Sequence, residues 1–235
     1  MTIVELPSPN ADDRDGQAVD ILLLHYTGML TAQAALDRLR DPAAKVSAHY
    51  VVGEDGAIYR LVDEAKRAWH AGVSCWAGAR DINRRSIGIE IVNPGHEFGY
   101  RPFPEAQMQA VRDLARGILA RHRIAPHRVL GHSDVAPLRK EDPGELFDWA
   151  GLAAAGIGLW PEPKPAAWDD AAFLAALHSY GYDLDGPPGT EPARARHAAI
   201  VAFERHFRPL RMTGRPDPEL KAILNGLIDL AGLKA

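Results

Sequence analysis

Two histidines and one aspartate in this chain could together bind a metal ion. His25, His132 and Asp142 are far apart in the sequence, so they do not form a local helical pair of ligands. Two imidazoles and one carboxylate are a ligand set that zinc accepts, and three protein ligands leave a fourth position open. An open position is typical of a catalytic zinc ion, because the ion can lower the pKa of a water molecule there to about 7. If the fold brings the three side chains together, the expected chemistry is hydrolysis.

Each of these residues stands at the end of a segment with a characteristic pattern. His25 ends the apolar run 21–24, which is typical of a buried strand. His132 follows three small or apolar residues at a point where a strand is expected to pass into a loop. Asp142 precedes a proline and a glycine, which indicate a tight turn. Taken singly, the three patterns are typical of ordinary structural histidines and an ordinary turn. Only their occurrence together, in the surrounding sequence, can identify a metal site.

The first 160 residues alternate between strand and helix patterns. Residues 48–62 contain two apolar runs around a glycine-rich turn and predict a β-hairpin. Thr31 can cap a helix that ends near Leu39, and a long amphipathic helix is predicted at about 105–121. This order of elements predicts an α/β fold with a mixed β-sheet flanked by helices.

A proline-rich segment follows, with proline at every second position from 161 to 165. This composition favours an extended spacer over a packed element. Beyond it, apolar residues at helical spacing predict three helices, the last with Asp217 as its cap. The sequence therefore predicts an α/β domain at 1–160, a linker at 161–168 and a small three-helix bundle at 169–235.

The composition is typical of a globular protein, with 46% hydrophobic and 25% charged residues. A formal net charge of −4 gives no electrostatic reason to expect nucleic-acid binding. No apolar run approaches the roughly 18 residues that a membrane span needs. The first residues also lack the charged start and apolar core of a secretory signal, which favours a cytoplasmic location.

Six short segments occur in order along about residues 18–150. They are His-Tyr-Thr at 25–27, Ser-Ala-His-Tyr-Val-Val at 47–52, Ala-Trp-His-Ala-Gly at 68–72, Ser-Ile-Gly-Ile-Glu-Ile at 86–91, Gly-His-Ser-Asp at 131–134 and Lys-Glu-Asp-Pro-Gly at 140–144. In this order they closely resemble the zinc-dependent N-acetylmuramoyl-L-alanine amidases. The resemblance implies the fold of phage T7 lysozyme and the peptidoglycan recognition proteins, with Zn²⁺ bound by His25, His132 and Asp142. It also implies hydrolysis of the amide between N-acetylmuramic acid and L-alanine of the stem peptide.

Glu90 is the predicted acid and base of this reaction. It alternates with Ile89 and Ile91, so it points away from the isoleucine face, and partial burial near the metal would raise its pKa towards the working pH. Lys140 could offset the negative charge that develops on the carbonyl oxygen. In the phage lysozyme branch a tyrosine that assists catalysis precedes the histidine of the second strand. Here Ala48 stands at that position, which leaves proton transfer to Glu90.

Five further residues are weaker candidates for substrate contact. Trp69 and His70 lie in the family's segment near the cleft, where they could pack on sugar or peptide, and core packing is the alternative. Asn83, Arg84 and Arg85 could bind carboxylates of the stem peptide, because arginine suits bidentate carboxylate recognition. A solvent-exposed loop explains these three residues as well.

The C-terminal part resembles the small peptidoglycan-binding domain that often accompanies such amidases. The similar segments are Tyr-Gly-Tyr at 180–182, Asp-Gly-Pro at 185–187 and Thr-Gly-Arg-Pro-Asp at 213–217, whereas Glu204 stands where that family commonly has glutamine. A bundle of about 65 residues is marginal alone, so the alternative is a bundle that only braces its neighbour. A wall-binding bundle would favour the cell envelope over the cytoplasm.

Two choices remain open in the expected function. The partner is peptidoglycan, either as polymer in the envelope or as soluble fragments, including the 1,6-anhydro form, in a recycling role. The other function class is a module that recognises muropeptides without cleaving them. Members of the fold that only bind lack one or more metal ligands, whereas this chain has all three as well as Glu90 and Lys140. Hydrolysis is therefore the favoured prediction.

Overall fold

The computed structural model describes residues 2–233 of the chain and confirms the mixed α/β sheet. Six strands lie in the order β1-β5-β4-β7-β3-β8. All described neighbours in this sheet are parallel except β4 and β5, which form the predicted hairpin. The strands are β1 (Ile3–Glu5), β3 (Ile21–Tyr26), β4 (Tyr50–Val52), β5 (Ile58–Arg60), β7 (Ser86–Ile91) and β8 (Val129–Gly131), and β2 (Ala11–Asp13) pairs separately with β6 (Lys66–Ala68).

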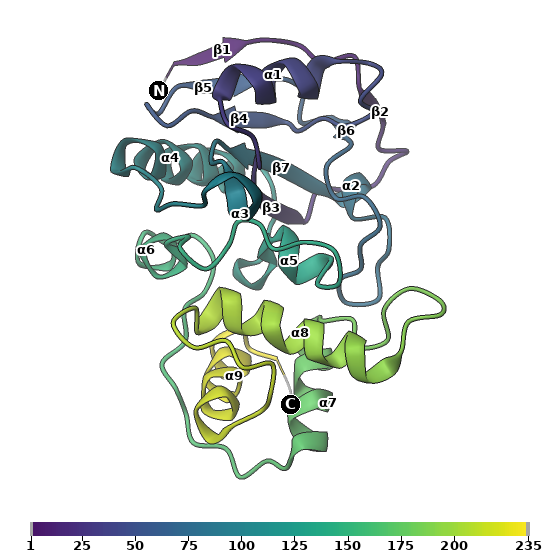
Figure 1. Cartoon of the computed structure of the whole chain (residues 1–235), viewed down its shortest axis with the longest axis vertical. Coiled ribbons are helices and arrows are strands. Elements are labelled where there is room, and N and C mark those ends of the chain that lie inside the picture. Colours follow the sequence, from purple (N-terminus) through teal and green to yellow (C-terminus); the bar gives the residue numbers. More distant parts are fainter. Residues whose placement is uncertain (1, 234–235) are drawn as a thin grey trace.

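The helices of the α/β part flank this sheet (Figure 1). They are α1 (Ala32–Arg40), α2 (Ile82–Arg85), α3 (Gly95–Phe98), α4 (Glu105–Arg121), α5 (His132–Val135) and α6 (Trp149–Ala154). Thr31 caps α1 as predicted, its hydroxyl accepting from the Ala34 backbone N–H at 3.1 Å. The structure differs after β8, where the expected loop is the short helix α5 that begins at His132. Within residues 2–233, no helix is both long and apolar enough to cross a membrane.

The two faces of the sheet belong to two different apolar cores. Side chains alternate along a strand, so Leu22 and Leu24 of β3 point one way and Ile21 and Leu23 the other. Leu22 and Leu24 pack with the apolar side of α4. His25 follows the alternation of Ile21 and Leu23, so this predicted metal ligand lies on the second face.

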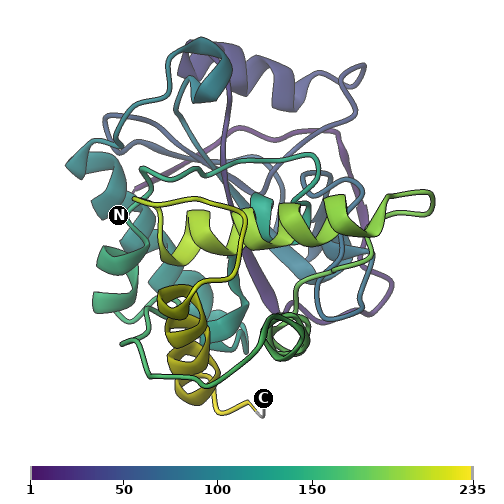
Figure 2. The ribbon, with the colours of Figure 1, turned by 60° about the horizontal axis from the view of Figure 1, so that its bottom comes forward.

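The second face is covered in part by the C-terminal bundle. This bundle consists of α7 (Asp170–Tyr180), α8 (Pro192–Phe207) and α9 (Pro218–Leu230). Ile21 and Leu23 share one buried cluster with Phe173, Leu177 and Phe203 of the bundle. Helix α8 lies along the boundary between the two parts, and in the turned view it crosses in front of the sheet (Figures 1 and 2). The predicted helices are therefore present, and they share a core with the α/β part.

The proline-rich segment at 161–168 lies against the bundle. The backbone N–H of Lys164 donates to the carbonyl of Ala222 in α9 at 2.9 Å. A Cβ atom at Gly226 of α9 would lie 2.1 Å from the Glu162 carbonyl oxygen, which is too close for any side chain. Glycine at this position thus allows the segment to pack directly on α9.

A buried carboxylate joins the bundle to the end of β8. Asp134 of α5 is 1% exposed and accepts at 2.7 Å from the backbone N–H of Gly131. The Tyr182 hydroxyl donates to its Oδ1 and His206 Nδ1 to its Oδ2, both at 2.7 Å. Because Asp134 lies two residues after His132, these contacts from the bundle fix the turn that carries this histidine.

Replacing Tyr182 by phenylalanine is expected to lower the free energy of unfolding by about 1–3 kcal/mol, because Asp134 Oδ1 loses its donor while remaining buried. The matched control is Tyr180→Phe, since Tyr180 is similarly buried but its hydroxyl makes no hydrogen bond within the described part of the chain. Urea denaturation of both variants measures the difference. Equal losses in the two variants would show that the Asp134 contact contributes nothing specific.

Candidate active site

The fold brings the three predicted metal ligands together at the ends of β3 and β8. His25 Nδ1 and His132 Nδ1 lie 2.9 Å apart, and each lies 3.0 Å from Asp142 Oδ2. All three residues are buried, with 1%, 3% and 5% exposure. His25 is the last but one residue of the parallel strand β3, and His132 directly follows its neighbour β8, which explains how residues 107 positions apart meet. The Ser133 backbone N–H, which donates to the Asp142 carbonyl at 2.9 Å, holds the Asp142 loop beside them.

Hydrogen bonds behind the two imidazoles determine where their protons are. His132 Nε2 faces the Ala71 carbonyl oxygen at 3.0 Å, so it carries the proton and donates. The Ser86 hydroxyl donates to the Ile82 carbonyl and therefore accepts from His70 Nε2. His70 Nδ1 is then an acceptor for His25 Nε2 at 2.9 Å. Both Nδ1 atoms of the metal-ligand pair are consequently left without a proton.

Three electron-rich atoms therefore converge without a hydrogen atom between them. This arrangement is unfavourable unless a cation lies among them, and separations near 3 Å match ligands that share one zinc ion at about 2.0–2.2 Å. Burial and the neighbouring His132 lower the pKa of His25 to about 4, so it is neutral at physiological pH. The donor set fits a divalent metal ion.

Gly88 makes room for the residue behind His25. The His70 ring lies across β7, where a Cβ atom at Gly88 would be 2.5 Å from His70 Nδ1. Glycine in the Ser-Ile-Gly-Ile-Glu strand therefore permits the His25–His70 hydrogen bond. His70 is 8% exposed and lines the cavity. The sequence predicted that it contacts substrate, and in the structure its hydrogen bond orients the metal-ligand candidate His25.

Glu90 lies beside His25, as its strand register requires. The two residues are direct partners in the parallel pairing of β3 with β7, so their side chains leave the same face of the sheet. Glu90 lines the cavity, and its Oε2 atom is buried without a hydrogen-bond partner among residues 2–233. Burial, reinforced by the Asp142 charge, raises the pKa of Glu90 well above 4.5. These properties suit a group that gains and loses a proton near neutral pH.

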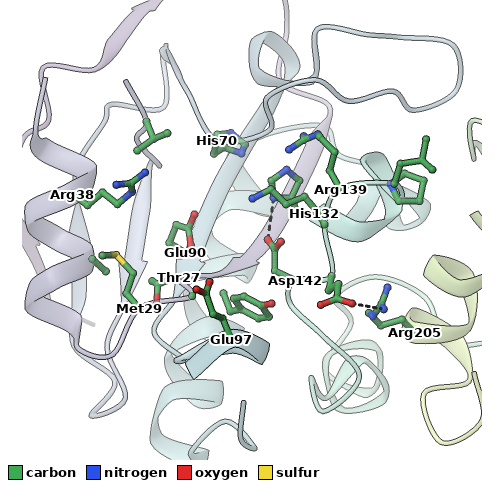
Figure 3. Close-up of a pocket in the computed structure, with 18 of the residues that line it drawn as sticks. Thr27, Met29, Arg38, His70, Glu90, Glu97, His132, Arg139, Asp142 and Arg205 are labelled. Carbon is green, nitrogen blue, oxygen red and sulfur yellow. Dashed lines mark hydrogen bonds and ion pairs between the residues drawn. The ribbon is translucent and has the colours of Figure 1, made fainter. Parts of the chain in front are cut away.

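A cavity of about 980 Å³ opens over these groups. Lys140 and Trp69 line it, in agreement with their predicted positions at the site. Figure 3 shows Arg38 of α1 and Arg205 of α8 at opposite edges, with Glu90, His132 and Asp142 between them. The volume exceeds what a single amide group needs, so the cavity can hold neighbouring parts of a larger substrate.

The structure does not bring Asn83, Arg84 and Arg85 to this cavity. Asn83 Oδ1 accepts from the backbone N–H groups of His70 and Ala71, at 3.0 and 2.7 Å, and so holds the loop that carries His70. Arg84 forms ion pairs with two aspartates, and Arg85 pairs with a third, on the outside of α2. The predicted contact of these residues with substrate carboxylates does not fit their positions. The Asn83 side chain is bonded to backbone N–H groups, and the guanidinium groups of Arg84 and Arg85 are paired with aspartates.

Residues of the bundle also line the cavity, which the motifs did not predict. They come from α8 and are His197, Ala198, Val201 and Arg205. The sequence places them in an ordinary amphipathic helix, and no motif marks them because the contact joins parts that are far apart in the chain. His206 of the same helix lies outside the cavity lining and is the buried partner of Asp134.

Comparisons with known proteins agree with this site. The family model described as N-acetylmuramoyl-L-alanine amidase matches residues 15–145, more than half of the chain. AmiD of Escherichia coli is 38% identical over 91% of this chain and 84% of that protein. AmpD of Haemophilus influenzae, a 1,6-anhydro-N-acetylmuramyl-L-alanine amidase, is 32% identical over 62% of this chain and 87% of that protein.

Two solved structures share both parts of the fold. E. coli AmiD in complex with the substrate anhydro-N-acetylmuramic acid-L-Ala-D-gamma-Glu-L-Lys has a TM-score of 0.81 and covers 97% of this chain and 93% of that chain. AmpDH3 of Pseudomonas aeruginosa with anhydromuramic pentapeptide has a TM-score of 0.82 at 36% identity, covering 90% of this chain and 92% of that chain. Sequence, fold and metal-ligand set agree, and the chain belongs to the N-acetylmuramoyl-L-alanine amidase family.

Proposed function

We propose that this amidase hydrolyses 1,6-anhydro-N-acetylmuramyl peptides, with zinc held by His25, His132 and Asp142. The observation that carries the proposal is the convergence of three ligand atoms in a cavity that also holds Glu90. The two structural relatives solved with anhydromuropeptides support this choice of substrate. Retention of every group that hydrolysis needs argues against a module that only binds muropeptides.

The residues of the cavity divide the work of hydrolysis. When bound, zinc would polarise the scissile carbonyl and lower the pKa of a water molecule. Glu90 accepts a proton from the attacking water and delivers it to the amide nitrogen, so that L-alanine leaves as an amine and the lactyl group becomes a carboxylate. Lys140 offsets the negative charge that develops on the carbonyl oxygen. Trp69 offers an aromatic surface to the sugar or the peptide.

The bundle is proposed to serve this site directly. Its shared core with β3, its contacts to Asp134 and the α8 residues in the cavity wall support a bracing and wall-forming role. Binding of polymeric peptidoglycan, which the sequence resemblance implies, remains a separate prediction. In the absence of such binding, soluble fragments are expected to be the better substrate.

Paired assays with the zinc-loaded protein test this assignment. Anhydromuramyl-tripeptide should be converted to free tripeptide and anhydro-N-acetylmuramic acid, while intact sacculi should release stem peptides more slowly. Mass spectrometry identifies the products. Binding of the soluble substrate without cleavage would support the recognition module, and faster cleavage of sacculi would support an envelope role.

A further inference from the structure

Arg205 brings an incompletely paired guanidinium group from α8 to the active-site cavity. The residue is 7% exposed and lines the cavity (Figure 3). Its Nε atom is buried and has no hydrogen-bond partner among residues 2–233. The closest carboxylate oxygens are Glu141 Oε1, 3.6 Å from Nη2, and Glu145 Oε2, 3.8 Å from Nε. Both distances exceed those of a hydrogen bond, so Arg205 keeps donors free for a ligand.

Arg208 shows how the same helix pairs an arginine that serves the fold, although its Nε atom, like that of Arg205, has no hydrogen-bond partner among residues 2–233. It lies about one turn beyond Arg205 and is also 7% exposed. Its Nη1 donates to both carboxylate oxygens of Asp217 at 2.8 Å and to Glu219 at 3.0 Å, which ties α8 to the start of α9. Arg205 has the same burial without such bonds. Burying a charged group that is not hydrogen-bonded is unfavourable, so a structural role alone does not explain it.

The position of Arg205 relative to the reaction limits which part of a substrate it can reach. Glu141, its neighbour at 3.6 Å, directly precedes the metal-ligand candidate Asp142 in the chain. Arg205 therefore borders the cavity on the side of the loop that carries Asp142. Along the stem peptide, the anionic group nearest to the scissile bond is on the second residue, so it is the first candidate ligand for a guanidinium in the cavity wall.

The second residue of the stem peptide carries a suitable anion. In the muropeptide bound to E. coli AmiD, glutamate is linked through its γ-carboxyl group, which leaves its α-carboxylate free. We propose that Arg205 binds this free α-carboxylate of γ-linked D-glutamate and so makes the C-terminal bundle a specificity-determining part of the active site. The inference rests on the proposed function, since it concerns the substrate of the same cavity.

Glu141 and Glu145 hold the guanidinium in place for this contact. Glu145 also pairs with His96 at 3.1 Å, so its carboxylate is shared between two cations. The Glu141 side chain is 54% exposed. Water therefore solvates its charge when a ligand carboxylate replaces it beside the Arg205 guanidinium. An arginine in this setting exchanges weak ion pairs for a bidentate carboxylate contact.

The test compares Arg205→Gln with wild type on three muramyl-tripeptides. One has both the D-glutamate α-carboxylate and the C-terminal carboxylate free, one has the α-carboxylate amidated, and one has the C-terminal carboxylate amidated. Wild type should favour the free α-carboxylate by about 10-fold or more in kcat/KM, mainly through KM, which is the size expected of a charge-assisted hydrogen bond. The variant should lose that preference and keep its rate on the α-amide. Arg205→Lys should restore part of it, and Arg194→Gln, which removes a charge from an exposed position of α8, should behave as wild type.

Zinc content and melting temperature are measured for each variant. Equal loss of activity on all three substrates, or a lower zinc content, would overturn the proposal in favour of bracing of the Asp142 loop. If Arg205→Gln loses a preference for the free C-terminal carboxylate and keeps the preference for the free α-carboxylate, the assignment to D-glutamate is overturned. A wild-type protein that cleaves none of the substrates contradicts the proposed function itself, whereas a cleaving wild type without any carboxylate preference contradicts this inference alone.

Discussion

Alanine in place of His132 is expected to abolish amide hydrolysis and to remove zinc from the protein. His132 supplies one of three ligand atoms that lie within about 3 Å of one another, and its loss leaves two ligands for an ion that takes three from the protein. The fold should persist, because the backbone N–H of residue 133 and the Asp134 contacts keep the loop in place. Activity, zinc by elemental analysis and a melting curve are measured on one preparation.

The matched control for this experiment is His127→Ala. His127 lies in the 3-10 turn before β8 and outside the cavity, so zinc and activity should both be retained. Treatment of wild type with a chelator should reproduce the loss, and added zinc should reverse it. Sustained hydrolysis by a verified metal-free protein would contradict the role assigned to the three ligands.

Glutamine in place of Glu90 is expected to lower kcat by about 10²- to 10⁴-fold, the usual contribution of a positioned acid or base. Glutamine keeps the size and the hydrogen-bonding reach of the side chain but cannot accept the proton of the attacking water. The structure supports a large effect because Glu90 lines the cavity beside His25 and its Oε2 atom is buried without a hydrogen-bond partner among residues 2–233. Zinc content should be unchanged, since Glu90 is not among the ligand atoms that converge.

Glu97→Gln provides the comparison for Glu90. Glu97 also lines the cavity but lies on the exposed helix α3. Replacing it by glutamine should therefore lower kcat only slightly. Single-turnover rates separate the chemical step from product release. Similar rates for wild type and Glu90→Gln, with zinc bound in both, would show that Glu90 only supports the strand and that another group transfers the proton.

Local patterns were sufficient to predict the sheet, whereas the residues that converge on it were identified through the resemblance to the amidase family. The alternation in 86–91 places Glu90 opposite the isoleucine face, and the parallel register then sets it beside His25. Parallel strands deliver the residues at their carboxyl ends to one edge of a sheet, so motifs at the ends of β3 and β8 meet without any information about loops. These predictions depend on strand period and order, which a sequence carries directly.

The role of His70 could not be predicted in this way. Its motif marks it as a residue near the cleft, but its contact with His25 depends on the absence of a side chain at Gly88 and on a proton order set by Ser86. For Arg84 and Arg85 the sequence suggested a role in substrate contact that the structure does not support. Their residue type suits carboxylate recognition, yet α2 directs them towards aspartates of the protein itself.

The unusual Glu204 of the bundle also becomes explicable only in three dimensions. The peptidoglycan-binding resemblance predicts glutamine there, and the structure shows a buried carboxylate that accepts from the backbone N–H groups of Thr213 and Gly214 at 2.8 and 2.7 Å. Arg208 donates to the same side chain. Each of these partners is a donor, so a carboxylate satisfies all of them where an amide would present its own N–H groups.

The four consecutive apolar residues 21–24 indicated that both faces of β3 are covered, but not by what. The second face is covered partly by Trp76, Ile82 and Val135 of the α/β part and partly by the bundle, whose first residue in this cluster is Phe173, about 150 positions later. During synthesis, Ile21 and Leu23 therefore lack part of their apolar partners until the bundle helices have left the ribosome. The α/β part cannot complete its packing as an independent first domain. Its packing is completed only when the bundle has been synthesised, so a chain that stops before the bundle presents part of an apolar face that chaperones and proteases can recognise.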